Sequence, residues 1–80
     1  MRDIKTYLHS LDKNSFEKLL EAVGTSDIKR EIMLSHYLRE IPLNILCGEL
    51  SISQQTAYKY HGEIILKIVK YLRKNDLKMQ

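Results

Sequence analysis

A group of hydrogen-bonding side chains just past the middle of the chain has the clearest chemistry. Its members are polar, close together and placed at the start of an expected helix: Ser53, Gln54, Gln55, Tyr58 and Lys59. A glutamine amide can pair with N6 and N7 of adenine, and a lysine can bond guanine or phosphate. Tyr58 can pack on a thymine methyl group or hydrogen-bond a phosphate. These residues, with Lys67 as a further phosphate contact, predict a surface that binds duplex DNA.

No pattern for catalysis or metal binding accompanies this group. The sequence has no phosphate-cradling glycine loop, no H-E-x-x-H, no Cys/His cluster and no nucleophile set beside a base. His9 has no second ligand at metal spacing, so we expect it to be exposed to solvent. The single cysteine, Cys47, lies in an apolar pattern that favours a buried side chain and cannot form an internal disulfide. We therefore expect no enzyme activity, no cofactor and no metal.

Two short helices joined by a tight turn would position the polar group. Pro42 suits the first position of a helix, because its φ is preset and its missing N–H is harmless there. This helix would close near Leu50. Ser53 can cap the second helix by accepting a bond from an orphan amide. The three residues between, 51–53, have the length of the turn in a helix-turn-helix, which we place at 42–61.

Side-chain sizes at this corner agree with two helices that cross closely. Cys47 is small enough for the crossing, and other apolar residues have the spacing to fill the angle: Leu46, Leu50, Ile52 and Ala57. Ser51 stands where such turns usually have glycine, a departure that the turn tolerates if Ser51 can adopt a left-handed conformation. An ordinary corner of two helices with no DNA role is the alternative, because fold alone does not determine function.

Two helices are predicted in the N-terminal helical part, 1–25. The first covers about 3–11, with apolar residues on one face: Ile4, Tyr7, Leu8 and Leu11. The second begins near Asn14, which forms a capping-box pattern with Glu17, and ends at Gly24. Its apolar stripe is Phe16, Leu19, Leu20 and Val23.

A third helix follows, capped by Thr25 or Ser26. Its main stripe consists of large apolar side chains: Leu34, Tyr37, Leu38 and Ile41. Ile28 and Ile32 lie on another face, so this helix is expected to contact neighbours on two sides.

The last helix is predicted from Gln54 to about Lys74. One stripe is charged, and consists of Lys59, Glu63, Lys67, Lys70 and Lys74. The opposite apolar arc, within 57–72, is about 180° wide, against about 100° for a simple surface helix. The first two helices could cover it, or a second copy could in a homodimer suited to a palindromic site. For Gly62 we favour a bend in this helix over a break or a close approach to DNA or another helix.

Length and composition predict one all-α domain, 1–80, a bundle of four to five helices with a long C-terminal helix. Hydrophobic residues make up 44% and charged residues 29%, as in ordinary globular chains. No apolar run is long enough for a membrane span, and the N-terminus lacks a signal core, so we expect a cytoplasmic protein. Residues 1–40 are neutral, whereas residues 41–80 carry the whole net charge of +3. A basic half is typical of nucleic-acid binders.

Residues 30–74 resemble the helix-turn-helix of the fourth region of bacterial sigma factors and of small phage regulators related to it. The matching residues are Leu46-Cys47, Leu50-Ser51-Ile52-Ser53 and Thr56-Ala57. The resemblance implies that the second helix contacts duplex DNA through the same five polar residues, and that RNA polymerase is a possible partner. A second resemblance, through LSISQQTAYKY and YLRKNDLKM, is to the helix-turn-helix of Mga-type regulators. Those domains often carry a β-wing, and no strand pair for one is seen here.

Together these features predict a small sequence-specific transcriptional regulator, bacterial or phage, that binds double-stranded DNA. The alternative is a helical module that binds a transcription or defence protein without contacting DNA.

Overall fold

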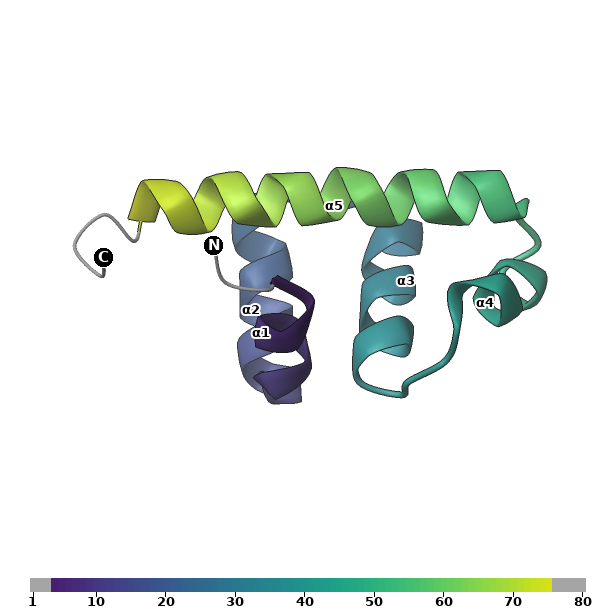
Figure 1. Cartoon of the computed structure of the whole chain (residues 1–80), viewed down its shortest axis with the longest axis horizontal. Coiled ribbons are helices and arrows are strands. Elements are labelled where there is room, and N and C mark those ends of the chain that lie inside the picture. Colours follow the sequence, from purple (N-terminus) through teal and green to yellow (C-terminus); the bar gives the residue numbers. More distant parts are fainter. Residues whose placement is uncertain (1–3, 76–80) are drawn as a thin grey trace.

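The computed structural model describes residues 4–75, and over this range the chain folds into five helices without strands (Figure 1). The helices are α1 (Ile4–Ser10), α2 (Lys13–Val23), α3 (Asp27–Tyr37), α4 (Leu43–Glu49) and α5 (Gln54–Asn75). The predicted all-α bundle with a long last helix is therefore confirmed. The predicted start of the first helix, Asp3, lies outside the described residues.

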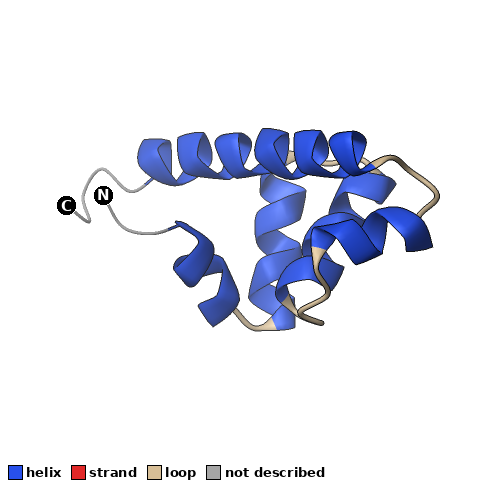
Figure 2. Cartoon of the chain, turned by 45° about the vertical axis from the view of Figure 1, so that its right-hand side comes forward, coloured by secondary structure: helices blue, strands red, loops and turns tan. Residues whose placement is uncertain are grey.

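The helices are arranged on one side of α5. Figure 1 shows α5 along one edge of the molecule, with α2 and α3 running roughly across it and α4 beside its N-terminal end. The view in Figure 2, turned by 45°, shows the same one-sided arrangement. The described part of the chain therefore leaves the opposite face of α5 uncovered along its length.

The larger of two core clusters joins α1, α2 and α3 to the middle of α5. Its buried members are Leu8, Phe16, Leu19, Leu20, Met33, Tyr37, Ile64 and Ile68. Partly buried apolar residues, including Leu11 just after α1 and Ile65 and Leu72 of α5, pack around them. The N-terminal helices thus cover the wide apolar arc of α5. This is one of the two predicted alternatives, the other being a second copy of the chain.

The smaller cluster lies on the other side of α3, against α4. Ile32, Leu43 and Leu46 are buried there, and Ile28 and Tyr60 are among the partly buried residues around them. Since Ile32 belongs to this cluster whereas Met33 and Tyr37 belong to the larger one, α3 has neighbours on two sides, as predicted.

The N-terminal cap of α2 is Asp12, so the capping box predicted from Asn14 and Glu17 is wrong. Asp12 Oδ1 accepts a hydrogen bond from the Ser15 N–H at 3.1 Å. A carboxylate is a strong acceptor for an orphan amide, and the helix therefore begins two residues before the predicted start, with Asn14 inside it. Hydrogen bonding from the Ser15 side chain, followed by that from its N–H, holds the pKa of Asp12 below its usual range. At the other end, Gly24 has φ +75° and its N–H donates to the Leu20 carbonyl at 3.0 Å, as predicted.

The last helix passes through Gly62 without a break, so neither a break nor the favoured bend is found there. The single helix extends to Asn75, and it is straight in Figure 1. A Cβ added at Gly62 would meet nothing within 4 Å, so no neighbouring helix approaches closely either. The buried residues Ala57 and Ile64 hold the helix to the core on either side of the glycine.

Candidate nucleic-acid interface

The turn between α4 and α5 closes in a defined hydrogen-bonded form. The Ile52 N–H donates to the Cys47 carbonyl at 2.9 Å, and the Ser51 N–H donates to the Gly48 carbonyl at 3.3 Å. Ser51 has φ +58°, so it meets the condition that a residue other than glycine must satisfy in this turn. These bonds are those of a Schellman motif, which satisfies the last carbonyls of a helix. Ser51, which stands in place of the usual glycine, thus has the left-handed backbone conformation that glycine usually provides.

The two helix starts at this corner differ in their caps. Pro42 precedes α4 as its N-cap, with ψ 149°, so the helix begins at Leu43, one position after the predicted start at Pro42. Ser53 caps α5 as predicted, because its Oγ accepts from the Thr56 N–H at 3.0 Å. The Ser53 hydroxyl also donates to Thr56 Oγ1 at 2.8 Å. This hydroxyl therefore acts as both a hydrogen-bond acceptor and a donor in the first turn of α5.

The five apolar residues assigned to this corner are buried or half-buried. Leu46, Cys47 and Ala57 are buried, and Leu50 and Ile52 are half-buried. The Cys47 thiol donates to the Asn44 carbonyl at 3.0 Å, and the side chain is inaccessible to solvent apart from a small fraction. Leu46, Leu50 and Ile52 belong to the smaller core cluster, which packs this turn against Ile32 of α3.

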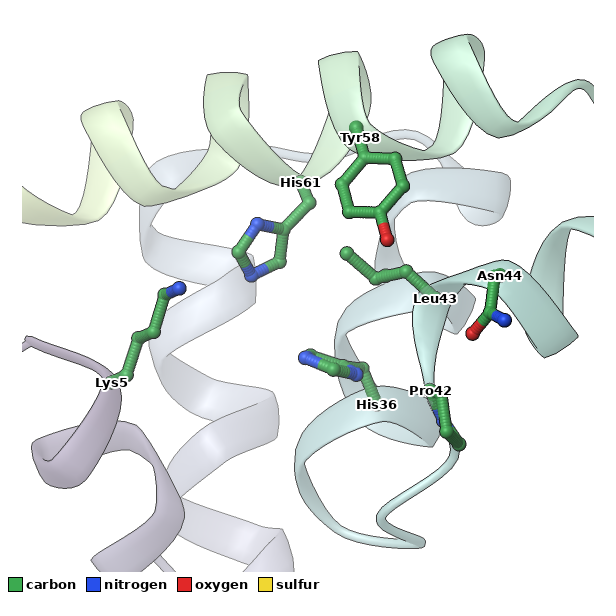
Figure 3. Close-up of a pocket in the computed structure, with 7 residues that line it drawn as sticks. All are labelled: Lys5, His36, Pro42, Leu43, Asn44, Tyr58 and His61. Atoms are coloured by element: carbon green, nitrogen blue, oxygen red, sulfur yellow. The ribbon is translucent and has the colours of Figure 1, made fainter.

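Four of the predicted DNA contacts lie together on the first two turns of α5. Gln54, Gln55 and Lys59 are exposed, and Tyr58 is 54% exposed. Gln55 and Lys59 are four residues apart and so share one face of the helix. Tyr58 is turned differently, since its hydroxyl points toward α4 (Figure 3). The corner therefore presents two amides and one ammonium to solvent, with a tyrosine ring at the edge.

Lys67 lies apart from this group. It is 13 positions beyond Gln54, a distance of about 20 Å along a helix. Its Nζ donates to the Gly24 carbonyl at 3.1 Å, which ties α5 to the end of α2. Two other basic side chains near α5 are also in ion pairs: Lys29 with Glu63 at 3.0 Å, and Arg30 with Glu17 at 3.8 Å. The hydrogen bond to Lys29 lowers the pKa of Glu63.

The three histidines of the chain gather around Tyr37. The ring centroids of His9 and His36 lie 4.8 Å and 4.7 Å from that of Tyr37, and the Tyr37 hydroxyl is 2.7 Å from His61 Nε2. His9 is exposed, as predicted. Sequence reasoning missed the buried position of His61, although its spacing from Ala57 and Ile64 places it on the same helix face.

The surroundings of His61 disfavour its charged form. Burial is the main cause, and repulsion from His36 and Lys5 adds to it, so the pKa falls from 6.5 to about 4. His36 is held separately, with its Nδ1 donating to the Ile41 carbonyl at 2.8 Å. Its Nε2 is then the nitrogen that carries the second proton when the ring is charged.

A hollow of about 310 Å³ opens beside these histidines. Its lining comes from α1, α3, α4 and α5 and the segment before α4: Lys5, His36, Pro42, Leu43, Asn44, Tyr58 and His61 (Figure 3). This volume is at the lower end of the range of small-molecule sites, about 300–1,000 Å³. The hollow shares Tyr58 with the exposed group at the start of α5.

The described residues contain neither a group of metal ligands nor a membrane-spanning helix. Within residues 4–75, no three His, Cys, Asp or Glu side chains are grouped so that they could hold a metal ion. Over the same range, none of the helices combines the length and the apolar content that crossing a bilayer requires.

Comparison with known proteins gave no relative. No protein-family model matches the chain, and no curated protein or solved structure is significantly similar to it.

Proposed function

We propose that this protein is a small regulator of transcription that binds duplex DNA with the start of α5. The observation that carries the proposal is the packed corner of α4 and α5, which holds Gln54, Gln55 and Lys59 exposed on the first two turns of a long helix. Recognition helices in helix-turn-helix proteins present their N-terminal turns to the major groove. The net charge of +3 in residues 41–80 supports contact with phosphates.

In this proposal the residues have different tasks. Gln55 reads a base edge, and Gln54 contacts a base or phosphate beside it. Lys59 bonds phosphate or guanine, whereas Ser53 fixes the helix start and reaches DNA only through its position. Lys67 makes a weaker, sequence-independent contribution, because its ammonium is already bonded to the Gly24 carbonyl. Occupation of a promoter in the cytoplasm would then block or recruit RNA polymerase.

Selection from a random duplex pool tests the proposal, with the whole chain at two salt concentrations. We expect one enriched motif for the native protein and a changed motif for Gln55→Ala. Asn14→Ala, which removes an exposed amide from α2, is the matched control and should leave the motif unchanged. An identical motif for Gln55→Ala would refute the groove assignment, and no enrichment with no retention on duplex at low salt would refute DNA binding.

One observation favours a second candidate function, a helical module that binds another protein. Ile45 and Leu66 are 50% and 55% exposed, which is high for large apolar side chains. Single exposed apolar residues are common on monomers, however, so this reading has less support than the first. Binding to DNA that falls steeply with salt distinguishes the two, because counterion release accompanies phosphate binding.

A further inference from the structure

We propose that the hollow between α1, α3, α4 and α5 binds a phosphate group. The proposal rests on the side chains that converge there and is independent of base reading by α5. It assigns a ligand class to His36, His61 and Lys5, which the proposed DNA contacts do not use.

The lining offers positive charge and hydrogen-bond donors from four directions. The Lys5 side chain points toward His61 from α1, and the His36 and His61 rings lie 5.4 Å apart between centroids (Figure 3). Asn44 contributes an amide from α4 and Tyr58 a hydroxyl from α5. None of the described residues that line the hollow is acidic. A tetrahedral oxyanion accepts hydrogen bonds on all sides, and this lining can supply them.

In each of the two histidine rings, one nitrogen makes a contact within the protein and the other nitrogen can bond a ligand. His36 uses Nδ1 to donate to the Ile41 carbonyl, which leaves Nε2 for a ligand. His61 uses Nε2 in its contact with Tyr37, which leaves Nδ1. Because these second contacts fix the ring planes, both imidazoles are oriented before any ligand arrives.

An anion in the hollow would also offset the repulsion that disfavours a proton on His61. In the structure, Lys5 and His36 repel a proton on His61. A doubly charged anion among the three groups favours the charged form of each imidazole, so binding should take up protons. The other titratable side chains that face this cluster are those of Tyr37 and Tyr58, and His9 contacts the ring of Tyr37. Affinity should therefore rise as the pH falls.

Sulfate is the probe for the test, because it keeps its double negative charge over the pH range in which an imidazole of ordinary pKa gains or loses a proton. The whole chain is titrated with sodium sulfate while the imidazole signals of the three histidines are followed by NMR, with sodium chloride at matched ionic strength as reference. We expect saturable shifts of the His36 and His61 signals and weaker binding at the higher pH. Shifts that do not saturate, or that chloride reproduces, would overturn the proposal.

Charge variants test whether the site depends on the assigned groups. Lys5→Met and His36→Gln should each weaken sulfate binding by about fivefold or more, whereas Lys5→Arg should retain most of it. Lys18→Met, at an exposed lysine of α2, is the matched control and should bind like the native protein. Far-UV circular dichroism shows whether each variant is folded. Equal affinity in Lys5→Met and Lys18→Met would overturn the assignment.

A second arm separates the two sources of a phosphate group. If a short duplex displaces sulfate from the His36 and His61 signals, the site takes a backbone phosphate of DNA. If a nucleoside monophosphate displaces sulfate and the duplex does not, the ligand is a small phosphorylated molecule. Because sulfate is titrated without DNA, saturable binding supports the site even where the duplex selection fails. If neither displaces it, the assignment to a phosphate group is wrong, and an adventitious anion site is all that remains.

Discussion

The hydroxyl of Tyr37 in α3 and Nε2 of His61 in α5 lie 2.7 Å apart, and their rings are stacked at an angle of 16°. Both residues are buried, and Tyr37 also belongs to the larger core cluster. When the imidazole carries its proton on Nδ1, the tyrosine hydroxyl donates to Nε2. The contact thus couples the packing of α3 against α5 to the protonation state of one histidine.

The first prediction concerns the stability of the protein at mildly acidic pH. The pKa of His61 is about 4 in the folded state against 6.5 otherwise, so below 6.5 the unfolded chain binds more protons. The stability contributed by neutral His61 is therefore present above pH 6.5 and is lost as the pH falls toward 4. The full loss is about 3 kcal/mol, from about 1.4 kcal/mol per pKa unit.

Urea unfolding across this window, for the native chain and for His61→Leu, measures the effect. The variant should be less stable near neutral pH but should lose less stability on acidification. His9→Gln, at an exposed ring, is the control and should keep the native pH dependence. Asp12, whose pKa is lowered, loses its contribution only below about 4 and does so in all three proteins. Parallel curves for the native protein and His61→Leu would show that His61 is not the titrating group.

The second prediction concerns the cap of α5. Ser53→Ala removes the acceptor for the Thr56 N–H and should destabilise the protein by about 1 kcal/mol. Ser26→Ala is a matched control at the start of α3, because Ser26 is an N-cap without a side-chain hydrogen bond. Its effect on the free energy of unfolding in urea should be clearly smaller. Equal losses for the two variants would mean that the Ser53 hydroxyl does not stabilise the helix start.

The third prediction uses two glycines with open surroundings and different backbones. Gly62 lies inside α5, and an alanine there meets nothing within 4 Å, so Gly62→Ala should stabilise the protein by up to about 1 kcal/mol. Gly24 also has free space but has φ +75°, so Gly24→Ala should destabilise it by about 1 kcal/mol. Thermal unfolding followed by circular dichroism should give shifts of opposite sign. A lower melting temperature for Gly62→Ala would indicate that the glycine is needed for the shape of α5.

Local backbone features were the easiest to predict from the sequence. The cap at Ser53, the left-handed Ser51 and the end of α2 at Gly24 each depend on a few adjacent residues, and all are found. The choice of Asp12 over Asn14 was missed because two capping residues stand two positions apart and the pattern favoured the wrong one. Gly62 was misjudged because packing on both sides of it outweighs its low helix propensity.

Contacts between distant segments were harder to predict. The apolar arc of α5 indicated that a partner was needed, but the choice between the chain's own helices and a second copy depended on tertiary packing. The histidine cluster joins α1, α3 and α5, and no spacing within one helix indicates that His9, His36 and His61 meet at one tyrosine. The hollow beside them could not be predicted for the same reason.

The fourth prediction compares two lysines of α5 that the structure places in different surroundings. Lys59 is exposed on the first turns, whereas the ammonium of Lys67 is bonded to the Gly24 carbonyl. If α5 docks through its start, Lys59→Ala should weaken binding to all duplexes and lower the slope of log K against log salt by about 1.

Lys67→Ala should change that slope less and should instead lower the free energy of unfolding slightly, because α5 loses its bond to the end of α2. Fluorescence anisotropy with a labelled duplex at four salt concentrations measures both slopes, and urea unfolding measures both stabilities. A larger change in slope for Lys67→Ala than for Lys59→Ala would place the phosphate contacts on the middle of α5. Since the middle of the helix is about 20 Å from its start, the corner of α4 and α5 could then not be the part that enters the groove.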